Sequence, residues 1–229
     1  MTRDVGLVVV DTAEEAARRT AQLLAAAARA GGNIALSGGS GPERAYELAA
    51  ELEPVWSSVE VWWGDDRCVP PDDELSNYRM AKEALLDRLA VPPAAVHRIE
   101  GELDPAEAAD RYDRALQGVR LDLDLLGIGP DGHTASLFPN APTLDVRDRL
   151  AVAAEPGLDP FVPRVTLTVP ANSAAAHVLF VVTGAAKADA AKRAFGDPPD
   201  PGTPASLVRS ESGRTTAILD TEAASRLSI

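Results

Sequence analysis

The residue whose type and position best suit catalysis is His133. It follows the apolar stretch 121–128 and a glycine-rich turn, and open parallel α/β sheets bind ligands at this end of a strand. An imidazole titrates near neutral pH, so His133 could act as a general base, and Asp131 could fix its tautomer. The alternatives are a structural hydrogen-bonding histidine and an Asp-x-His metal site. The metal site ranks lower because His97 and His177 belong to unrelated segments.

A run of small residues at 37–42 forms a candidate anion site. It follows an apolar run and precedes a helix that Pro42 would open. Backbone N–H groups of such a loop and of the helix N-terminus bind phosphate. The candidate binding residues are Ser37, Gly38, Gly39 and Ser40. The alternative is a flexible turn. A nucleophile elbow is excluded because its Gly-x-Ser-x-Gly pattern fails at Pro42.

Two cations follow the ends of other predicted strands. Arg67 lies in the polar segment 64–70, and Lys187 lies in the first turn of a helix predicted after residue 183. A guanidinium can clamp a phosphate, and a lysine in a first helical turn opposes the helix dipole, a conflict typical of functional sites. The alternatives are a surface ion pair for Arg67 and a solvated helix position for Lys187. We expect Cys68 to be a small buried residue, because no base neighbours it.

Strands and helices alternate along the chain and must place these side chains. Short apolar runs predict strands at residues 5–10, 33–37, 59–63, 121–128, 164–169, 177–183 and 215–219. Caps and glycines predict helices at residues 12–29, 42–52, 76–89, 104–116, 185–195 and from 221 onward. A short helical turn is expected after residue 133, and loops at 64–75 and 196–204. This alternation predicts a parallel sheet covered on both faces, in one domain of residues 1–229.

The composition narrows the classes of function. The chain has 229 residues, of which 45% are apolar and 25% charged, the mix of a globular protein. A net charge of -13 argues against binding nucleic acid or an anionic membrane, and it requires local cations to hold any anionic ligand. The single cysteine excludes a disulfide framework. The N-terminal segment lacks a signal-peptide core, and no apolar run approaches the roughly 20 residues of a membrane span, so a cytoplasmic protein is expected.

The chain resembles the 6-phosphogluconolactonase family, the cytosolic hydrolases of the pentose phosphate pathway. The matching segments are ALSGGSGPERAYELA at 35–49, WWGDDRCVPPDDELSNYRMA at 62–81, LDLLGIGPDGHTASLFPN at 124–140, RVTLTVPANSAA at 164–175 and VLFVVTGAAKADA at 178–190, with a weaker match, PASLV, at 204–208. The GPDGHTASLFP portion is highly specific, and the match covers nearly the whole chain. The family usually has Thr where this chain has Gly41, and Glu where it has Asp66.

The resemblance implies a Rossmann-like three-layer sandwich with a mostly parallel sheet, as in the glucosamine-6-phosphate deaminases. It also implies that His133 is the catalytic base. The loop that begins at Ser37, together with Arg67 and Lys187, would surround the substrate phosphate. Arg164, which opens the segment 164–175, is counted among the substrate-binding residues.

The implied reaction is hydrolysis of 6-phospho-D-glucono-1,5-lactone by general-base activation of water. Such a lactone is an activated ester, so one positioned base and good orientation suffice. One alternative is an amino-sugar-phosphate deaminase, but that family has a Glu shortly after the histidine, and residues 134–140 contain no carboxylate. The other is a non-catalytic sugar-phosphate sensor, but the first core strand begins near residue 5 and leaves no room for a DNA-binding unit.

No metal and no cofactor is expected. Beyond His133 the sequence offers no credible set of metal ligands. Residues 127–132 formally match a dinucleotide-binding Gly-x-Gly-x-x-Gly pattern, but Pro139 leaves too little room for the full helix that such a site requires. The expected partner is therefore a small phosphorylated sugar lactone, and the sequence carries no indication of oligomeric state.

Overall fold

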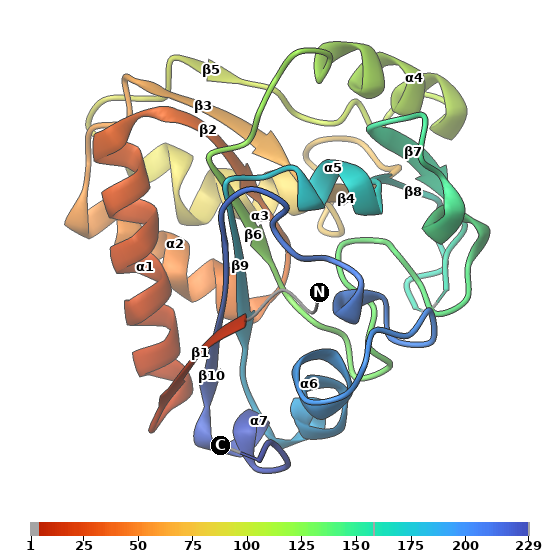
Figure 1. Cartoon of the computed structure of the whole chain (residues 1–229). Helices are drawn as coiled ribbons and strands as arrows, with labels where there is room; N and C mark the ends of the chain where they lie inside the picture. The colour runs from red at the N-terminus through yellow and green to blue at the C-terminus, as the bar shows by residue number, and fades with distance from the viewer. Residues whose placement is uncertain (1–4, 158, 229) are drawn as a thin grey trace.

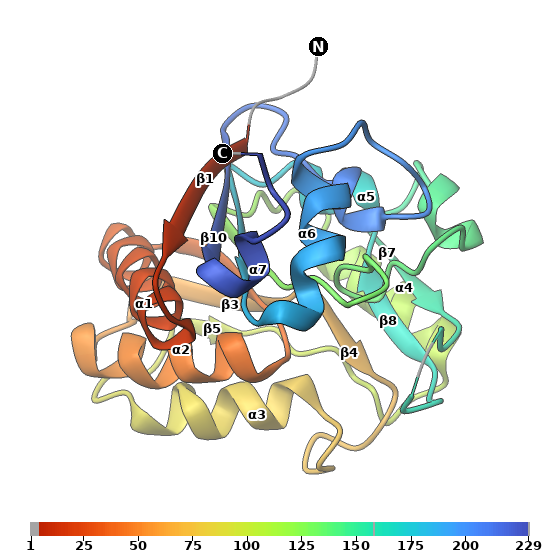
Figure 2. The ribbon, with the colours of Figure 1, turned by 90° about the horizontal axis from the view of Figure 1, so that it is seen from below.

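A seven-stranded sheet forms the centre of the molecule (Figures 1 and 2). The computed structural model describes residues 5–157 and 159–228. The strands of this sheet are β1 (Val5–Val10), β2 (Gly32–Leu36), β3 (Val59–Trp63), β5 (Ala95–Val96), β6 (Leu123–Leu126), β9 (His177–Val182) and β10 (Arg214–Asp220). All neighbours in the order β1-β10-β9-β6-β2-β3-β5 are parallel. The predicted parallel sheet is therefore confirmed, and only the two-residue edge strand β5 was not predicted.

The strand order reverses between β2 and β6. From β2 the chain continues outward to β3 and β5, whereas from β6 it continues to β9 and β10 on the other side. Ile34 of β2 lies opposite Leu123 of β6. The carboxyl ends of two such strands diverge into a crevice where open α/β sheets bind ligands. This reversal brings the loop after β2 and the loop after β6 together.

Helices cover both faces of the sheet and complete the three layers (Figures 1 and 2). One face carries α1 (Ala13–Ala30), α2 (Ser40–Leu52) and α3 (Asn77–Ala84). The other face carries α4 (Pro105–Ala115), α5 (Val169–Ser173) and α6 (Ala188–Phe195), and the short α7 (Thr221–Ala224) lies beside α6. All six residues of β9 are buried, as expected for a strand covered on both faces. The predicted α/β sandwich is confirmed.

A second, antiparallel sheet was not predicted as such. It consists of β4 (Asp65–Arg67), β8 (Arg164–Leu167) and β7 (Ala151–Ala154), in the order β4-β8-β7. The prediction of a loop at 64–75 is wrong at its start, because β4 pairs with β8 there. The polar sequence of β4 has no apolar alternation, so only its partner makes it a strand. In this register Arg67 lies directly opposite Arg164.

Several predicted helix limits shift. The helical turn expected after residue 133 is wrong: Ala135 and Asn140 have positive φ angles of 48° and 57°, which a helix does not allow. Helix α2 begins at Ser40, two residues before the predicted start. Helix α3 ends at residue 84 and is followed by a separate 3-10 turn. A 3-10 turn over residues 185–187 also replaces the predicted start of α6.

Two predictions reach beyond the described residues. The predicted single domain includes residues 1–4, 158 and 229, and the expected lack of a signal peptide falls partly on residues 1–4. Those residues lie outside the part of the chain that the structure describes. Within that part, no helix has the length and apolar character needed to span a membrane.

Candidate active site

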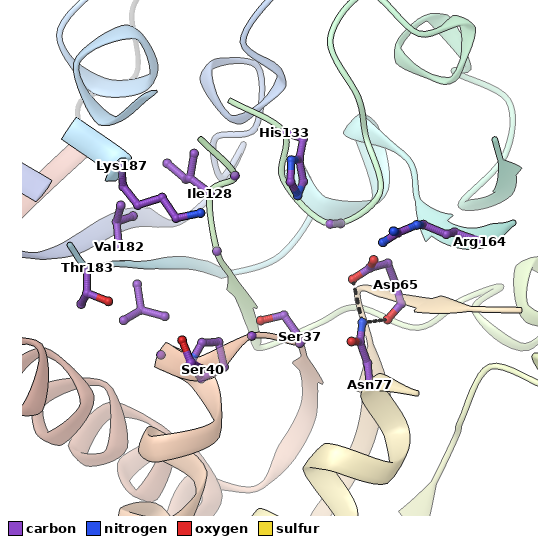
Figure 3. A pocket seen from close by; sticks show the side chains of 18 of the residues that line it. Ser37, Ser40, Asp65, Asn77, Ile128, His133, Arg164, Val182, Thr183 and Lys187 are labelled. Carbon is purple, nitrogen blue, oxygen red and sulfur yellow. Dashed lines mark hydrogen bonds between the residues drawn. The ribbon is translucent and has the colours of Figure 1, made fainter. Parts of the chain in front are cut away.

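A cavity of about 240 Å³ opens at the carboxyl ends of β2, β6 and β9 (Figure 3). It lies where the strand order reverses, and it brings together residues from segments far apart in the sequence. Among the predicted site residues, those that line it are Ser37, Gly38, Gly39, Ser40, Arg67, His133, Arg164 and Lys187. Asp131 does not line the cavity, but its Oδ1 contacts the Nδ1 atom of His133. The structure thus gathers all nine predicted residues in one place, while their roles stay predictions.

The loop between β2 and α2 and the first residues of α2 line the cavity. The Tyr46 hydroxyl donates to the Ser37 carbonyl and accepts from the Ser37 N–H, both at 2.8 Å, which fixes the start of the loop. Gly38 allows a close approach, because a Cβ there would lie 2.0 Å from Oδ1 of Asn77. Gly39 caps α2 without a side-chain hydrogen bond. The first N–H groups of a helix lack intrahelical acceptors, so this end can bind an anion.

Arg67 and Arg164 enter the cavity from the small sheet. Arg67 Nη1 donates to the Leu75 carbonyl at 2.7 Å and to Asn77 Oδ1 at 2.9 Å. Arg164 Nη2 donates to the Pro160 carbonyl at 3.2 Å, and its guanidinium lies 5.5 Å from the centre of the Phe138 ring. Burial lowers the pKa of Arg164, and the charge of Arg67 lowers it further. Two guanidinium groups held this close favour an anionic ligand between or beside them.

His133 offers one ring nitrogen to the cavity. Its Nδ1 lies 2.6 Å from Asp131 Oδ1, which also accepts the His133 backbone N–H at 3.1 Å. With the carboxylate accepting at Nδ1–H, the lone pair of the imidazole is left on Nε2. Gly129 makes room for this pair, because a Cβ there would lie 2.0 Å from His133 Nδ1. Partial burial raises the pKa of Asp131, but the hydrogen bonds and charge of His133 lower it more, so the carboxylate stays ionised.

Lys187 approaches the cavity from the end of β9, on the side opposite Arg164 (Figure 3). Among the described residues, no carboxylate lies within ion-pair distance of its ammonium group. Burial lowers the pKa of Lys187, and the charge of Asp131 opposes that effect. A half-buried ammonium group without a counter-ion is poised to bind an anion.

Three further polar residues lie next to the arginine pair and were not assigned from the sequence. Asp65 is a carboxylate that lines the cavity, and its Oδ2 accepts a hydrogen bond from Ser136 Oγ at 2.5 Å. Asn77 Nδ2 donates to the Asp65 carbonyl at 3.0 Å, while its Oδ1 accepts from Arg67. Asn77 follows Ser76, the predicted helix cap, and this placement at a helix start was the one available signal.

The other two histidines lie outside the cavity, as the sequence suggested. His97 pairs with Glu60 at 2.8 Å, and His177 Nε2 lies 3.0 Å from the Thr216 hydroxyl. Burial lowers the pKa of His177 to about 4. The described residues contain no group of three or more His, Cys, Asp and Glu side chains suited to a metal ion. Independence from metal remains a prediction.

Comparison with known proteins adds a second line of evidence. A family model described as glucosamine-6-phosphate isomerases/6-phosphogluconolactonase matches residues 9–217. A 6-phosphogluconolactonase of Nostoc sp. is 39% identical over 206 residues, which cover 86% of this chain and 85% of that protein. The structure of 6-phosphogluconolactonase from Trypanosoma cruzi superposes with a TM-score of 0.90 at 28% identity, over 100% of this chain and 99% of that one. A monomeric glucosamine-6-phosphate deaminase, 19% identical with a TM-score of 0.84 over 97% of this chain and 100% of its own, shares the fold.

Proposed function

Since this chain belongs to the glucosamine-6-phosphate isomerase/6-phosphogluconolactonase family, we propose that its cavity hydrolyses 6-phospho-D-glucono-1,5-lactone to 6-phosphogluconate. The chain is then a carboxylic ester hydrolase of the pentose phosphate pathway. The observation that best supports this role is the His133–Asp131 pair beside a cavity rich in cations. The pair would supply a base that activates water, and the cations beside it would bind an anionic sugar.

In the proposed reaction, His133 Nε2 takes a proton from a water molecule as the water oxygen attacks the lactone carbonyl carbon. The carbonyl π electrons move onto oxygen and form a tetrahedral oxyanion. When the carbonyl reforms, the bond to the ring oxygen breaks, and the imidazolium gives its proton to that oxygen. Asp131, 2.6 Å from Nδ1, stabilises the imidazolium in between. A single positioned base of this kind contributes about 10²–10⁴ in rate.

Arg164 is proposed to act at the lactone end of the substrate. Its guanidinium lies over Phe138, and the Phe138 ring centre is 5.4 Å from that of His133. This places a positive charge near the base, where negative charge develops on the carbonyl oxygen and remains on the product carboxylate. Asp65 lies at the same end and disfavours the phosphate dianion there.

The phosphate is proposed to bind at the N-terminus of α2. On one side of this loop, Arg67 donates a hydrogen bond to Asn77, which in turn contacts Gly38. Lys187 lines the cavity on the other side. A net charge of -13 repels a dianion at long range, but physiological salt screens exposed charges beyond roughly 8 Å. Short-range contacts with these groups therefore provide the affinity.

Deamination of an amino-sugar phosphate is the other reaction of the family and fits less well. In the deaminases a Glu after the histidine assists ring opening. No Glu lines this cavity among the residues described, and its only lining carboxylate among them, Asp65, is held by Ser136 and Asn77.

The proposed site of action is the cytoplasm. The reducing conditions there suit a chain whose one cysteine, Cys68, is a half-buried free thiol.

The direct test is an assay of acid release from freshly generated 6-phosphogluconolactone, measured against the spontaneous rate. We expect a rate far above the spontaneous one, and no ammonia from glucosamine 6-phosphate. Ammonia release without lactone hydrolysis would replace the proposal with the deaminase reaction. Equal rates with and without the protein would leave it without support.

A further inference from the structure

Gly41 leaves a space between the start of α2 and the end of β9. A Cβ at this position would lie 3.8 Å from Val181 Cγ2 and 3.9 Å from Thr183 Oγ1, which are ordinary van der Waals distances. Its backbone is helical and does not require glycine. Gly38 differs, because a Cβ there would collide with Asn77. Neither packing nor backbone conformation therefore demands a glycine at position 41.

Thr183 lies on the other side of that space. It directly follows β9 and lines the cavity, and Figure 3 shows it at the same end as Ser40 and Lys187. The Asp220 carboxylate accepts the N–H of the next residue, Gly184, at 2.9 and 3.0 Å, which fixes the backbone beside it. Among the described residues, no protein group forms a hydrogen bond with Thr183 Oγ1.

The contacts at this end suit one kind of ligand. Gly41 and Ser40 begin a helix of 13 residues, Lys187 supplies an ammonium group, and no carboxylate of the described chain lines this end. A threonine hydroxyl can rotate to donate its proton to an anionic oxygen. The oxygens of a phosphate can accept more hydrogen bonds than one ammonium group and a few N–H groups donate. A further fixed donor can therefore add a hydrogen bond to the phosphate.

We infer that Thr183 Oγ1 donates a hydrogen bond to the substrate phosphate and that Gly41 leaves the space through which phosphate and hydroxyl meet. This inference rests on the proposed function, because it assigns the phosphate of the proposed substrate to this end of the cavity. Thr183 is then a specificity residue for phosphorylated over plain sugar lactones.

The test compares Thr183→Val, which keeps the shape and removes the hydroxyl, with Thr183→Ser, which keeps the hydroxyl. Binding of 6-phosphogluconate and of inorganic phosphate is measured by calorimetry, with thermal unfolding as a check on folding. We expect Thr183→Val to weaken both ligands about ten- to a hundredfold, the effect of losing one hydrogen bond to a charged group. Thr183→Ser should stay within about threefold of the parent. Equal affinities of the parent and Thr183→Val would overturn the inference.

A second pair of variants tests the role of Gly41. In the parent, Gly41→Ala fills the space beside the Thr183 hydroxyl with a methyl group and should weaken phosphate binding. In the Thr183→Val background, where the hydroxyl is already absent, the same change should weaken binding much less. No loss in the parent, or equal losses in both backgrounds, would show that the space at Gly41 does not serve the contact between the phosphate and Thr183.

Binding measurements also separate this inference from the proposed function. If the parent binds 6-phosphogluconate but hydrolyses no lactone, the proposed function fails and the assignment of Thr183 can still be read from the variants. If the parent hydrolyses the lactone and Thr183→Val binds phosphate ligands as well as the parent, the inference alone fails.

Discussion

The two ring nitrogens of His133 have different surroundings. Nδ1 is held by Asp131, and Nε2 remains for a water molecule in the cavity. In the proposed reaction, the carboxylate sets the tautomer beforehand and offsets the positive charge of the imidazolium when it forms. Gly129 permits the arrangement by leaving no side chain in its place. The proposed base therefore depends on two neighbours, Asp131 and Gly129, that transfer no proton in the proposed reaction.

Replacing His133 by Asn should remove most of the catalysed rate. Asn retains some hydrogen bonding but cannot accept a proton near neutral pH, so we expect kcat to fall by about 10²–10⁴. The measurement is lactone hydrolysis above the spontaneous rate, with circular dichroism to confirm the fold. His97→Asn is the matched control, because His97 lies outside the cavity and pairs with Glu60. Near-normal turnover in His133→Asn would exclude this residue as the base.

Arg67→Ala and Lys187→Ala should each raise KM for the phosphorylated lactone by about ten- to a hundredfold, the effect of one lost charge-assisted hydrogen bond. Plain gluconolactone has no phosphate to lose, so its hydrolysis should change much less. Lys192→Ala serves as control, since Lys192 pairs with Asp197 outside the cavity. If both substrates suffer equally, these cations serve the lactone chemistry or the fold.

The sequence alone was enough to assign residues whose types are common in catalytic or anion-binding sites. It was not enough to assign residues whose types occur throughout proteins. A histidine or arginine after a predicted strand points to a site by itself. Asn77 and Ser136 are ordinary polar residues whose contribution depends on Arg67 and Asp65, neighbours that only the fold supplies. Thr183 lies within a segment that the sequence analysis singled out. Only the structure shows that its hydroxyl borders the space left by Gly41.

The Asp66 carboxylate forms several of the hydrogen bonds that join the start of α3 to the small sheet. Asp66 Oδ1 accepts from the N–H groups of Arg67 and Asn77 at 2.8 and 2.7 Å, and Oδ2 accepts from the Tyr78 N–H at 3.0 Å. The Ser76 hydroxyl donates to the same oxygen at 3.2 Å. Burial raises the pKa of Asp66 to about 6 even against these hydrogen bonds. The Asp66 side chain thus holds the start of α3 in place, including Asn77, whose Oδ1 accepts a hydrogen bond from the Arg67 guanidinium.

Asp66→Ala should therefore affect both stability and substrate affinity. It leaves buried N–H groups without acceptors, which costs about 3 kcal/mol or more, and it frees Asn77 from its place beside Arg67. We expect a lower Tm together with a KM for the phosphorylated lactone raised about tenfold, or about 1.4 kcal/mol of binding.

The matched control for Asp66 is Asp104, which caps α4 through the Ala106 and Glu107 N–H groups at an exposed position away from the cavity. Asp104→Ala should cost about 1 kcal/mol of stability and leave KM as it is. If the two variants shift KM alike, α3 does not position the phosphate site.

The elements that the sequence predicts well are those that carry their own pattern. The central strands β6 and β9 are buried along their whole length, and a glycine follows within two residues of the end of each. The small antiparallel sheet lacked such a pattern: β4 is Asp-Asp-Arg and β7 is a four-residue run of alanine and valine. Both become strands through pairing with β8, a contact between distant segments that no local window contains.

Asp124 places an acidic group in the core of the protein. It lies on β6 with no exposed surface, and no protein group among the described residues bonds to either carboxyl oxygen. Burial raises its pKa to about 8, with a smaller contribution from the charge of Asp65. Unfolding returns this carboxyl to its ordinary value of 3.8. Between these two pH values the folded protein retains a proton that the unfolded chain releases.

This difference predicts a stability that falls as the pH rises from about 4 to about 8, by up to 1.4 kcal/mol for each pH unit from this group alone. Asn has nearly the same shape as Asp and cannot titrate. The free energy of unfolding of Asp124→Asn should therefore increase relative to that of the parent as the pH rises across that range. Urea unfolding at pH 5 and pH 7.5 measures the change. A constant difference between parent and variant at the two pH values would contradict a raised pKa for Asp124.

Among the strands that the structure describes, β1 lies at the edge of the sheet and pairs only with β10. This pairing has a consequence while the chain is being synthesised. About 200 residues separate the end of β1 from the start of β10 along the chain. At a translation rate of 5–20 residues per second, β1 leaves the ribosome roughly 10–40 s before its partner. During that interval the strands around the cavity can pair, while an apolar strand waits without a neighbour. Unpaired strands of this kind start aggregation, so the nascent chain is at greater risk than the finished protein.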